Sequence, residues 1–119
     1  MNKFFGILLI IILPVFFTLS CSKDGGSGGG FTVDCSIVTN KAFAADISPI
    51  IQASCNIAGC HAAGSFNGPG ALTNYAQISS ASSSIRPAIA SGRMPQTGTL
   101  TTAQKNSIIC WIDSGAPNN

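Results

Sequence analysis

Two cysteines and the only histidine of the chain lie within seven residues, in the segment CNIAGCH at positions 55–61. The region around this segment, residues 31–119, is near the size at which a hydrophobic core alone gives little stability. Domains of this length recruit cross-links, metals or cofactors, and thiols and imidazole are the side chains that bind them. The fold is therefore expected to depend on the chemistry of this segment.

Both sulfurs of the segment are placed to add to the vinyl groups of a haem while His61 ligates the iron. The usual attachment motif has two residues between its cysteines, and here there are four. The longer spacing requires a backbone bulge, and Gly59 is the residue best able to adopt the necessary dihedral angles. Taken alone, the segment leaves covalent haem, a disulfide and a metal site open.

The chain has five cysteines, of which Cys21 is expected to bear lipid, as argued below. If Cys55 and Cys60 hold haem, Cys35 and Cys110 remain and are expected to form a disulfide. On the chain-entropy model, closing a loop of this length contributes roughly 4 kcal/mol to stability. Every cysteine then has a role.

Residues 1–20 are typical of a secretory signal, with Lys3 followed by an apolar run from Phe4 to Leu19. The run is shorter than the ~20 residues that a membrane-spanning helix needs, which favours cleavage over a retained anchor. The sequence TLSC at 18–21 resembles a bacterial lipobox, in which Cys21 becomes the lipid-modified first residue. The alternative is an ordinary signal peptide beside a cysteine that pairs elsewhere.

Residues 21–30 are mostly glycine and serine and form a flexible tether, so the folded domain is predicted to span residues 31–119. The protein is expected to be exported and anchored to a membrane by lipid. Ser22 stands where enteric bacteria place an inner-membrane retention aspartate, which favours the outer membrane, facing the periplasm or the cell surface. Six Lys and Arg against four Asp make no basic stripe, so nucleic acid is not expected as a partner.

Helical signals dominate the domain, and no window alternates with period two. The breaker-rich stretch 62–71 is predicted to be a loop. Thr101 and Gln104 have the spacing of a capping box, and apolar residues follow them on one helical stripe. Helices are therefore predicted at 49–54 after a Ser48 cap, from an Asn74 cap through Ile78, over a turn or two within 79–91, and from 101 to a stop at Gly115.

Met94 is the only methionine that remains once the signal is removed. It lies in the sequence GRMP at 92–95, where glycine and proline indicate a loop, and its thioether is a soft ligand suited to haem iron. The alternative for Met94 is plain core packing.

Residues 43–119 resemble the single-domain class of c-type cytochromes, through DISPII at 46–51, the Cys-His segment, GRMP at 92–95 and CWIDSGA at 110–116, in that order. The resemblance implies an all-α, small cytochrome c-like fold with long loops around one covalent haem c, ligated by His61 and Met94. It also implies that a loop carbonyl accepts the ring N–H of His61, with Pro69 in the sequence GPG at 68–70 as the candidate. It further implies packing between two groups of residues near the two ends of the domain, Ile47, Ile50 and Ile51 against Ile108, Trp111 and Ile112.

The function expected from these features is one-electron transfer to and from redox partner proteins, without catalysis at the iron. The chain has no glutamate and no second histidine to serve as an acid or base. Two other classes remain open at this point. One is a disulfide- or zinc-stapled lipoprotein with a structural or binding role, and the other is a haem-based sensor in which Met94 is displaceable.

Overall fold

The computed structural model describes residues 31–119. The predictions on the signal peptide (1–20), the tether (21–30) and the lipidated Cys21 lie outside the described residues. Regular structure within 31–119 is entirely helical, which confirms the all-α prediction, and no strand occurs among these residues. The elements are η1 (Phe43–Ile47), α1 (Ser48–Ser54), α2 (Tyr75–Ser80), α3 (Ser82–Ala90) and α4 (Thr102–Asp113).

The last helix, α4, has the capping box that its sequence predicts. The Thr101 hydroxyl accepts from the backbone N–H of Gln104 (3.2 Å), and the Gln104 side chain accepts from the backbone N–H of Thr101 (2.9 Å). Each side chain thus satisfies a backbone donor that the start of a helix leaves unpaired. The middle of α4 is buried from Asn106 to Trp111, so this helix runs through the core.

The first helical segment begins earlier than predicted. Helical backbone starts with the π turn η1 at Phe43, and Ser48 has helical dihedrals instead of capping a new helix. Pro49 has no N–H to donate to a carbonyl four residues back, and a wider turn before it accommodates that gap. The prediction of a Ser48 cap is therefore wrong, although the end of α1 at Ser54 is as expected.

The middle of the chain contains two helices that almost join. The Asn74 side chain caps α2 by accepting from the backbone N–H of Gln77 (3.0 Å), as predicted. Ala81 separates α2 from α3, and the predicted turn or two within 79–91 is a helix of nine residues. It is longer than expected because one apolar stripe continues from α2 into α3 and is buried throughout: Ile78, Ala81, Ile85, Ala88 and Ile89.

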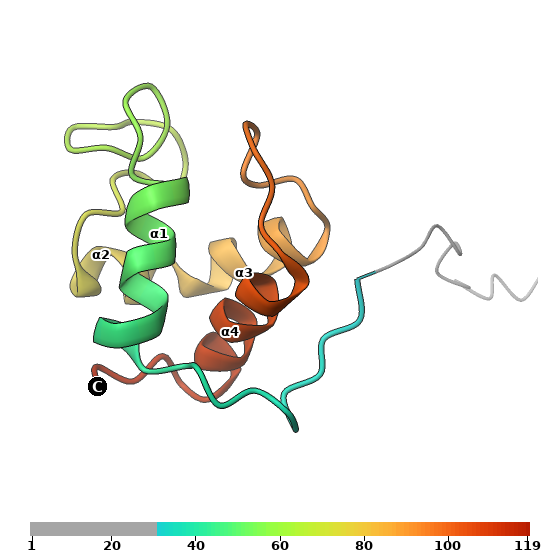
Figure 1. Cartoon of the computed structure of the whole chain (residues 1–119). Coiled ribbons are helices and arrows are strands. Elements are labelled where there is room, and N and C mark those ends of the chain that lie inside the picture. Colours follow the sequence, from blue (N-terminus) through green and yellow to red (C-terminus); the bar gives the residue numbers. More distant parts are fainter. Residues whose placement is uncertain (1–30) are drawn as a thin grey trace, which may run out of the picture.

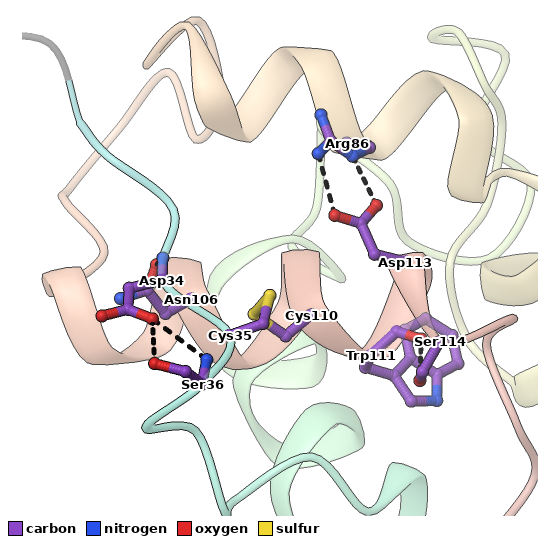
Figure 2. The surroundings of a disulfide bond; sticks show 9 residues. All are labelled: Asp34, Cys35, Ser36, Arg86, Asn106, Cys110, Trp111, Asp113 and Ser114. Atoms are coloured by element: carbon purple, nitrogen blue, oxygen red, sulfur yellow. Dashed lines mark hydrogen bonds and ion pairs between the residues drawn. A yellow bond between two sulfur atoms is a disulfide. The ribbon is translucent and has the colours of Figure 1, made fainter.

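Residues 31–42 have no helix, and their first part lies against α4. Cys35 and Cys110 form the predicted disulfide, with Cα atoms 5.5 Å apart and 75 positions between them in sequence. Figure 2 shows Cys35 on this N-terminal segment against the α4 ribbon. The Asp34 backbone N–H donates to the Asn106 side chain (3.4 Å) one turn of α4 away from Cys110. A covalent bond and a polar contact thus hold the start of the domain against its last helix.

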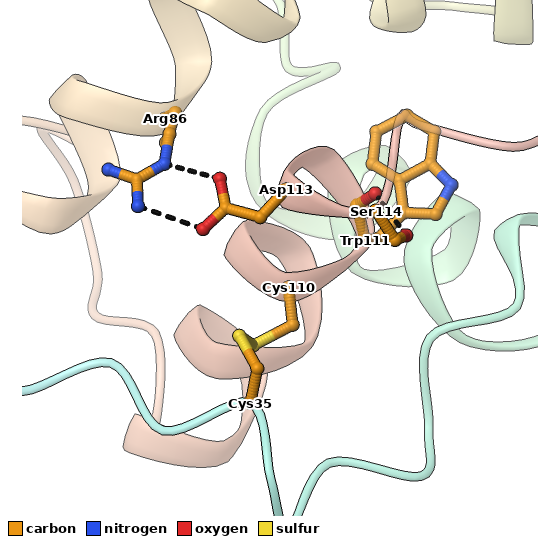
Figure 3. A network of polar contacts seen from close by, with 6 residues as sticks. All are labelled: Cys35, Arg86, Cys110, Trp111, Asp113 and Ser114. Atoms are coloured by element: carbon orange, nitrogen blue, oxygen red, sulfur yellow. Dashed lines mark hydrogen bonds and ion pairs between the residues drawn. A yellow bond between two sulfur atoms is a disulfide. The ribbon is translucent and has the colours of Figure 1, made fainter.

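An ion pair joins α3 to α4. The Arg86 guanidinium donates to both carboxylate oxygens of Asp113, at 2.6 and 2.8 Å, as Figure 3 shows. This is the fork-to-fork geometry in which arginine is most specific for carboxylate. Both side chains remain partly exposed, so the pair orients the two helices more than it stabilises them.

The C-terminal tail folds back under the core. The Trp111 indole N–H donates to the carbonyl of Pro117 (2.8 Å), and the Tyr75 hydroxyl donates to that of Ala116 (2.9 Å). The backbone N–H of Phe43 donates to the Asn119 side chain (2.8 Å), which places the C-terminus beside η1 in Figure 1. The Phe43 ring contacts the Tyr75 ring edge to face and the Trp111 ring at a tilt, with centroids 5.0 and 5.5 Å apart. The aromatic polar tips are thereby satisfied inside an apolar cluster.

The residues expected to pack the two ends of the domain together do belong to one core. Ile47, Ile51, Ile108 and Trp111 are fully buried in the same cluster, and Ile50 and Ile112 pack against its edge. In Figure 1 the loop after α1 and the loop before α4 rise on the same side of these helices, away from the C-terminus. None of the helices within residues 31–119 is long and apolar enough to cross a membrane.

Candidate functional site

One open pocket is bounded by the loop after α1, α3 and the loop before α4. Its volume is about 850 Å³, within the range of roughly 300–1,000 Å³ that is usual for ligand and cofactor sites. Buried apolar side chains from α1, α3 and the loops form its wall: Ile51, Leu72, Ile85, Ala88, Ile89 and Leu100. The five residues that the sequence assigns to a cofactor all line it: Cys55, Cys60, His61, Pro69 and Met94.

The four residues between Cys55 and Cys60 form a bulge that is closed at its base. The backbone N–H of His61 donates to the carbonyl of Cys55 (3.1 Å), and that of Cys60 donates to the carbonyl of Ile57 (2.8 Å). Gly59 has a φ of +80°, a conformation that glycine adopts at little cost and that agrees with its expected role. The chain therefore returns on itself, and His61 lies next to Cys55 despite the longer spacing.

His61 is buried, with 7% of its surface exposed, and its ring has a fixed orientation. Nδ1 lies 2.8 Å from the carbonyl oxygen of Gly70. Because a carbonyl only accepts, Nδ1 bears the proton, and the lone pair of the ring is on Nε2. A histidine ligand whose other nitrogen donates to a carbonyl is oriented for metal binding.

The carbonyl that accepts from His61 belongs to Gly70 and not to Pro69, so the residue named from the sequence is off by one position. Pro69 lines the pocket instead. Gly70 has a φ of +104°, which turns its peptide in a way open to glycine. The path of this loop decides which carbonyl meets the ring, and the sequence GPG alone does not fix that path.

Cys55 and Cys60 are free thiols and both are half-buried. Burial raises the pKa of the Cys55 thiol, because a thiolate is less stable away from water. The nearby Cys60 raises this pKa further, because two neighbouring thiolates would repel each other. Cys55 is thus held as a protonated thiol near neutral pH. Both thiols remain available for covalent chemistry, since Cys35 and Cys110 are already paired.

Met94 reaches the pocket from the loop between α3 and α4. Its backbone N–H donates to the carbonyl of Ala88 in the last turn of α3 (3.1 Å), which ties the loop to that helix. The Met94 side chain is half-buried, and Pro95 beside it also lines the pocket. Met94 lies at the pocket and outside the core cluster.

The pocket is nearly uncharged. No Asp, Glu, Lys or Arg occurs between Ile47 and Ile85, and Arg93 is the one such residue in the pocket lining. Arg93 is exposed, so it lies at the mouth. An apolar pocket of this kind suits a large hydrophobic group with an anionic edge better than a small polar substrate.

The donor set suits haem better than zinc. Structural zinc takes four ligands, and the disulfide leaves Cys55, Cys60 and His61 as the free thiol and imidazole donors in residues 31–119. No three His, Cys, Asp or Glu side chains cluster as a metal site in this part of the chain. Two thiols, one oriented imidazole and one thioether around an apolar pocket do match the requirements of a covalent haem.

Two further residues at the site were not identified from the sequence. Ser65 and Asn67 bond to the backbone of the Cys55–Cys60 bulge through their side chains. Both lie in the stretch 62–71, whose sequence indicates only a loop. Small polar residues in such loops often bond to nearby backbone, but the sequence does not show to which groups.

No protein-family model, curated protein or solved structure matches this chain. The interpretation of the pocket therefore rests on its own geometry and chemistry.

Proposed function

We propose that residues 31–119 form a small c-type cytochrome domain that holds one covalent haem and transfers single electrons. The proposal rests on one observation: two free thiols, a buried histidine with its Nδ1 proton engaged, and a methionine all line one apolar pocket. Bound haem would supply an iron that cycles between two oxidation states. The side chains of the pocket would exclude water from it.

Each residue has a distinct part in this proposal. The thiols of Cys55 and Cys60 would each add across one vinyl group, so that sulfur bonds to one carbon and the thiol proton ends on the other, with no electrons gained or lost. His61 would ligate the iron through Nε2. Met94 would provide a second ligand to the iron, and a histidine–methionine pair raises the reduction potential and favours simple electron transfer.

The same proposal places the domain outside the cytoplasm, tethered through lipid on Cys21 and facing redox partner proteins. The Cys35–Cys110 disulfide supports this location, because disulfides persist in oxidising compartments and are rare in the cytoplasm. The near absence of charged and acid–base side chains around the pocket supports a carrier over an enzyme.

The direct test is a haem-stained denaturing gel of full-length protein made with a working cytochrome maturation system, together with a reduced-minus-oxidised absorbance spectrum. Stain that survives denaturation and a c-type difference spectrum are expected. The double variant Cys55→Ala/Cys60→Ala is the control and should lose the stain. Colourless wild-type protein would refute the proposal and favour a disulfide-stapled structural or binding lipoprotein. Carbon monoxide binding to the unmutated, reduced protein would favour the sensor.

A further inference from the structure

The loop that follows His61 folds back onto the Cys55–Cys60 bulge. The Asn67 side-chain N–H₂ donates to the carbonyl of Gly59 (2.8 Å) and to that of Cys60 (3.1 Å). The Ser65 hydroxyl also donates to the Cys60 carbonyl, and it accepts from the backbone N–H of Asn67 (3.2 Å). Two consecutive peptide groups next to the second attachment cysteine are thus held by one amide.

The backbone hydrogen bonds of the bulge engage its N–H groups and leave the carbonyls of Gly59 and Cys60 to other partners. α1 ends at Ser54, so Cys60 lies beyond the helix that holds the first cysteine. A Cβ atom built on Gly59 would meet nothing within 4 Å, which means that side-chain packing does not confine this turn. The N–H groups of Cys60 and His61 donate to backbone carbonyls of the bulge. The carbonyls of Gly59 and Cys60 accept instead from side chains of the loop that follows His61.

A two-residue spacing would place both cysteines about one helical turn apart, where the helix backbone itself sets their separation. The four-residue spacing gives up that support. Asn67 meets the two carbonyls that a continuing helix would have paired with its own N–H groups.

We propose that Asn67 is a positioning residue that holds Cys60 where its thiol adds to the second vinyl group of the haem, in place of helix hydrogen bonds. This inference rests on the proposed haem function. Loss of Asn67 would leave the Cys55 thioether intact, with one S–H at Cys60 and one unreacted vinyl group. Asn67 is exposed, so its replacement does not disturb the core.

The test compares wild type, Asn67→Ala, Asn67→Asp and Gln96→Ala, all as full-length protein made with cytochrome maturation. Gln96 is the matched control, because it is exposed and lines the same pocket from the other loop. Asn67→Asp keeps the size of the side chain and removes its donors. After alkylation with iodoacetamide and digestion, mass spectrometry counts protein with one or two thioethers.

A several-fold increase in haem bound through Cys55 alone, with Cys60 alkylated, is expected in both Asn67 variants. Wild type and Gln96→Ala should have two thioethers. Two intact thioethers in Asn67→Ala, at the wild-type fraction, would overturn the inference.

Amide hydrogen exchange of the same purified proteins gives a readout that does not require haem. Exchange in the segment 55–61 should rise several-fold in Asn67→Ala, while the buried amides of α4 stay unchanged. If wild type contains no haem, the carrier proposal fails, and unchanged exchange in 55–61 would then refute the positioning role of Asn67 separately. If exchange in Asn67→Ala instead rises only in the segment 55–61, Asn67 still fixes the position of Cys60.

Discussion

The backbone N–H of Leu72 donates to the carbonyl of His61 at 2.8 Å, across eleven positions of the chain. With the His61 N–H bonded to Cys55 and Nδ1 bonded to Gly70, every polar group of this residue except Nε2 is engaged. Both the backbone and the ring of His61 are therefore fixed before any ligand binds. Such preorganisation is what a metal site needs for a precise geometry.

We expect His61→Gly to prevent normal haem incorporation, because His61 is the only imidazole in the chain. The substitution leaves a cavity in which free imidazole can replace the lost ring. Added imidazole should restore a six-coordinate absorbance spectrum to whatever haem remains bound. The measurement is a titration followed by absorbance, with His61→Gln as the control that leaves no room for imidazole. A normal spectrum in His61→Gly without imidazole would contradict this role.

The double variant Cys35→Ala/Cys110→Ala should unfold at lower denaturant concentration than wild type. On the chain-entropy model, a disulfide that spans 75 positions contributes about 4 kcal/mol. Urea denaturation, monitored through the fluorescence of the buried Trp111, measures the difference. Wild type treated with a reductant serves as the matched control and should behave like the variant. Equal stability of the reduced and oxidised forms would show that the disulfide does not stabilise the fold.

The sequence predicts the parts of the fold that depend on local patterns. The capping box of Thr101 and Gln104 and the Asn74 cap are short-range signals, and both form as expected. The disulfide follows from counting cysteines once Cys55 and Cys60 have another role. The residues proposed for the cofactor also meet at one pocket, although they lie far apart in sequence.

Most of the features that the sequence does not indicate depend on hydrogen bonds from side chains to backbone carbonyls. The tail is held by carbonyls of Ala116 and Pro117 that accept from Tyr75 and Trp111, and carbonyls leave no trace in a residue pattern. For the same reason, the sequence does not indicate that the Gly70 carbonyl accepts from His61, or that Asn67 bonds to the carbonyl of Gly59. The early start of the first helix at Phe43 reflects a π turn, which sequence periodicity does not distinguish.

Removing the Arg86–Asp113 ion pair with Asp113→Asn should lower the melting temperature at pH 7 by no more than about 5 °C, because the pair is partly exposed. The hydrogen bonds from Arg86 lower the pKa of Asp113 below its usual value. A carboxylate with a lowered pKa in the folded state stabilises the fold above its unfolded pKa of about 3.9, and the gain is lost as pH falls through the folded pKa. The difference between variant and wild type should therefore shrink below pH 4.

Thermal unfolding at several pH values and in high salt measures this effect. Salt should also reduce the difference, since it screens exposed charges. Asp46→Asn is a suitable control, because Asp46 accepts from its own segment at Ala42 and joins no second helix. A difference between Asp113→Asn and wild type that is the same at pH 3 and pH 7 would contradict the electrostatic explanation.

Met94→Ala should retain covalent haem and open the sixth coordination position. The Met94 backbone is tied to Ala88, so the loop keeps its place when the side chain is shortened. Loss of a thioether that favours ferrous iron should lower the reduction potential, by a part of the ~0.8 V range that axial ligands cover. Potentiometric titration measures the potential, and carbon monoxide should bind to the reduced variant but not to reduced wild type.

Met94→His provides the complementary comparison, because imidazole donates more strongly to iron than a thioether does. This variant should be six-coordinate again, exclude carbon monoxide and have a lower potential than wild type. Gln96→Ala, from the same loop, controls for changes in the pocket mouth that do not involve a ligand. If Met94→Ala keeps the wild-type potential and the weak near-infrared sulfur-to-iron band, Met94 is not the ligand. Electron transfer would then depend on another sixth group, and a displaceable position, as in a sensor, would become the better explanation of the site.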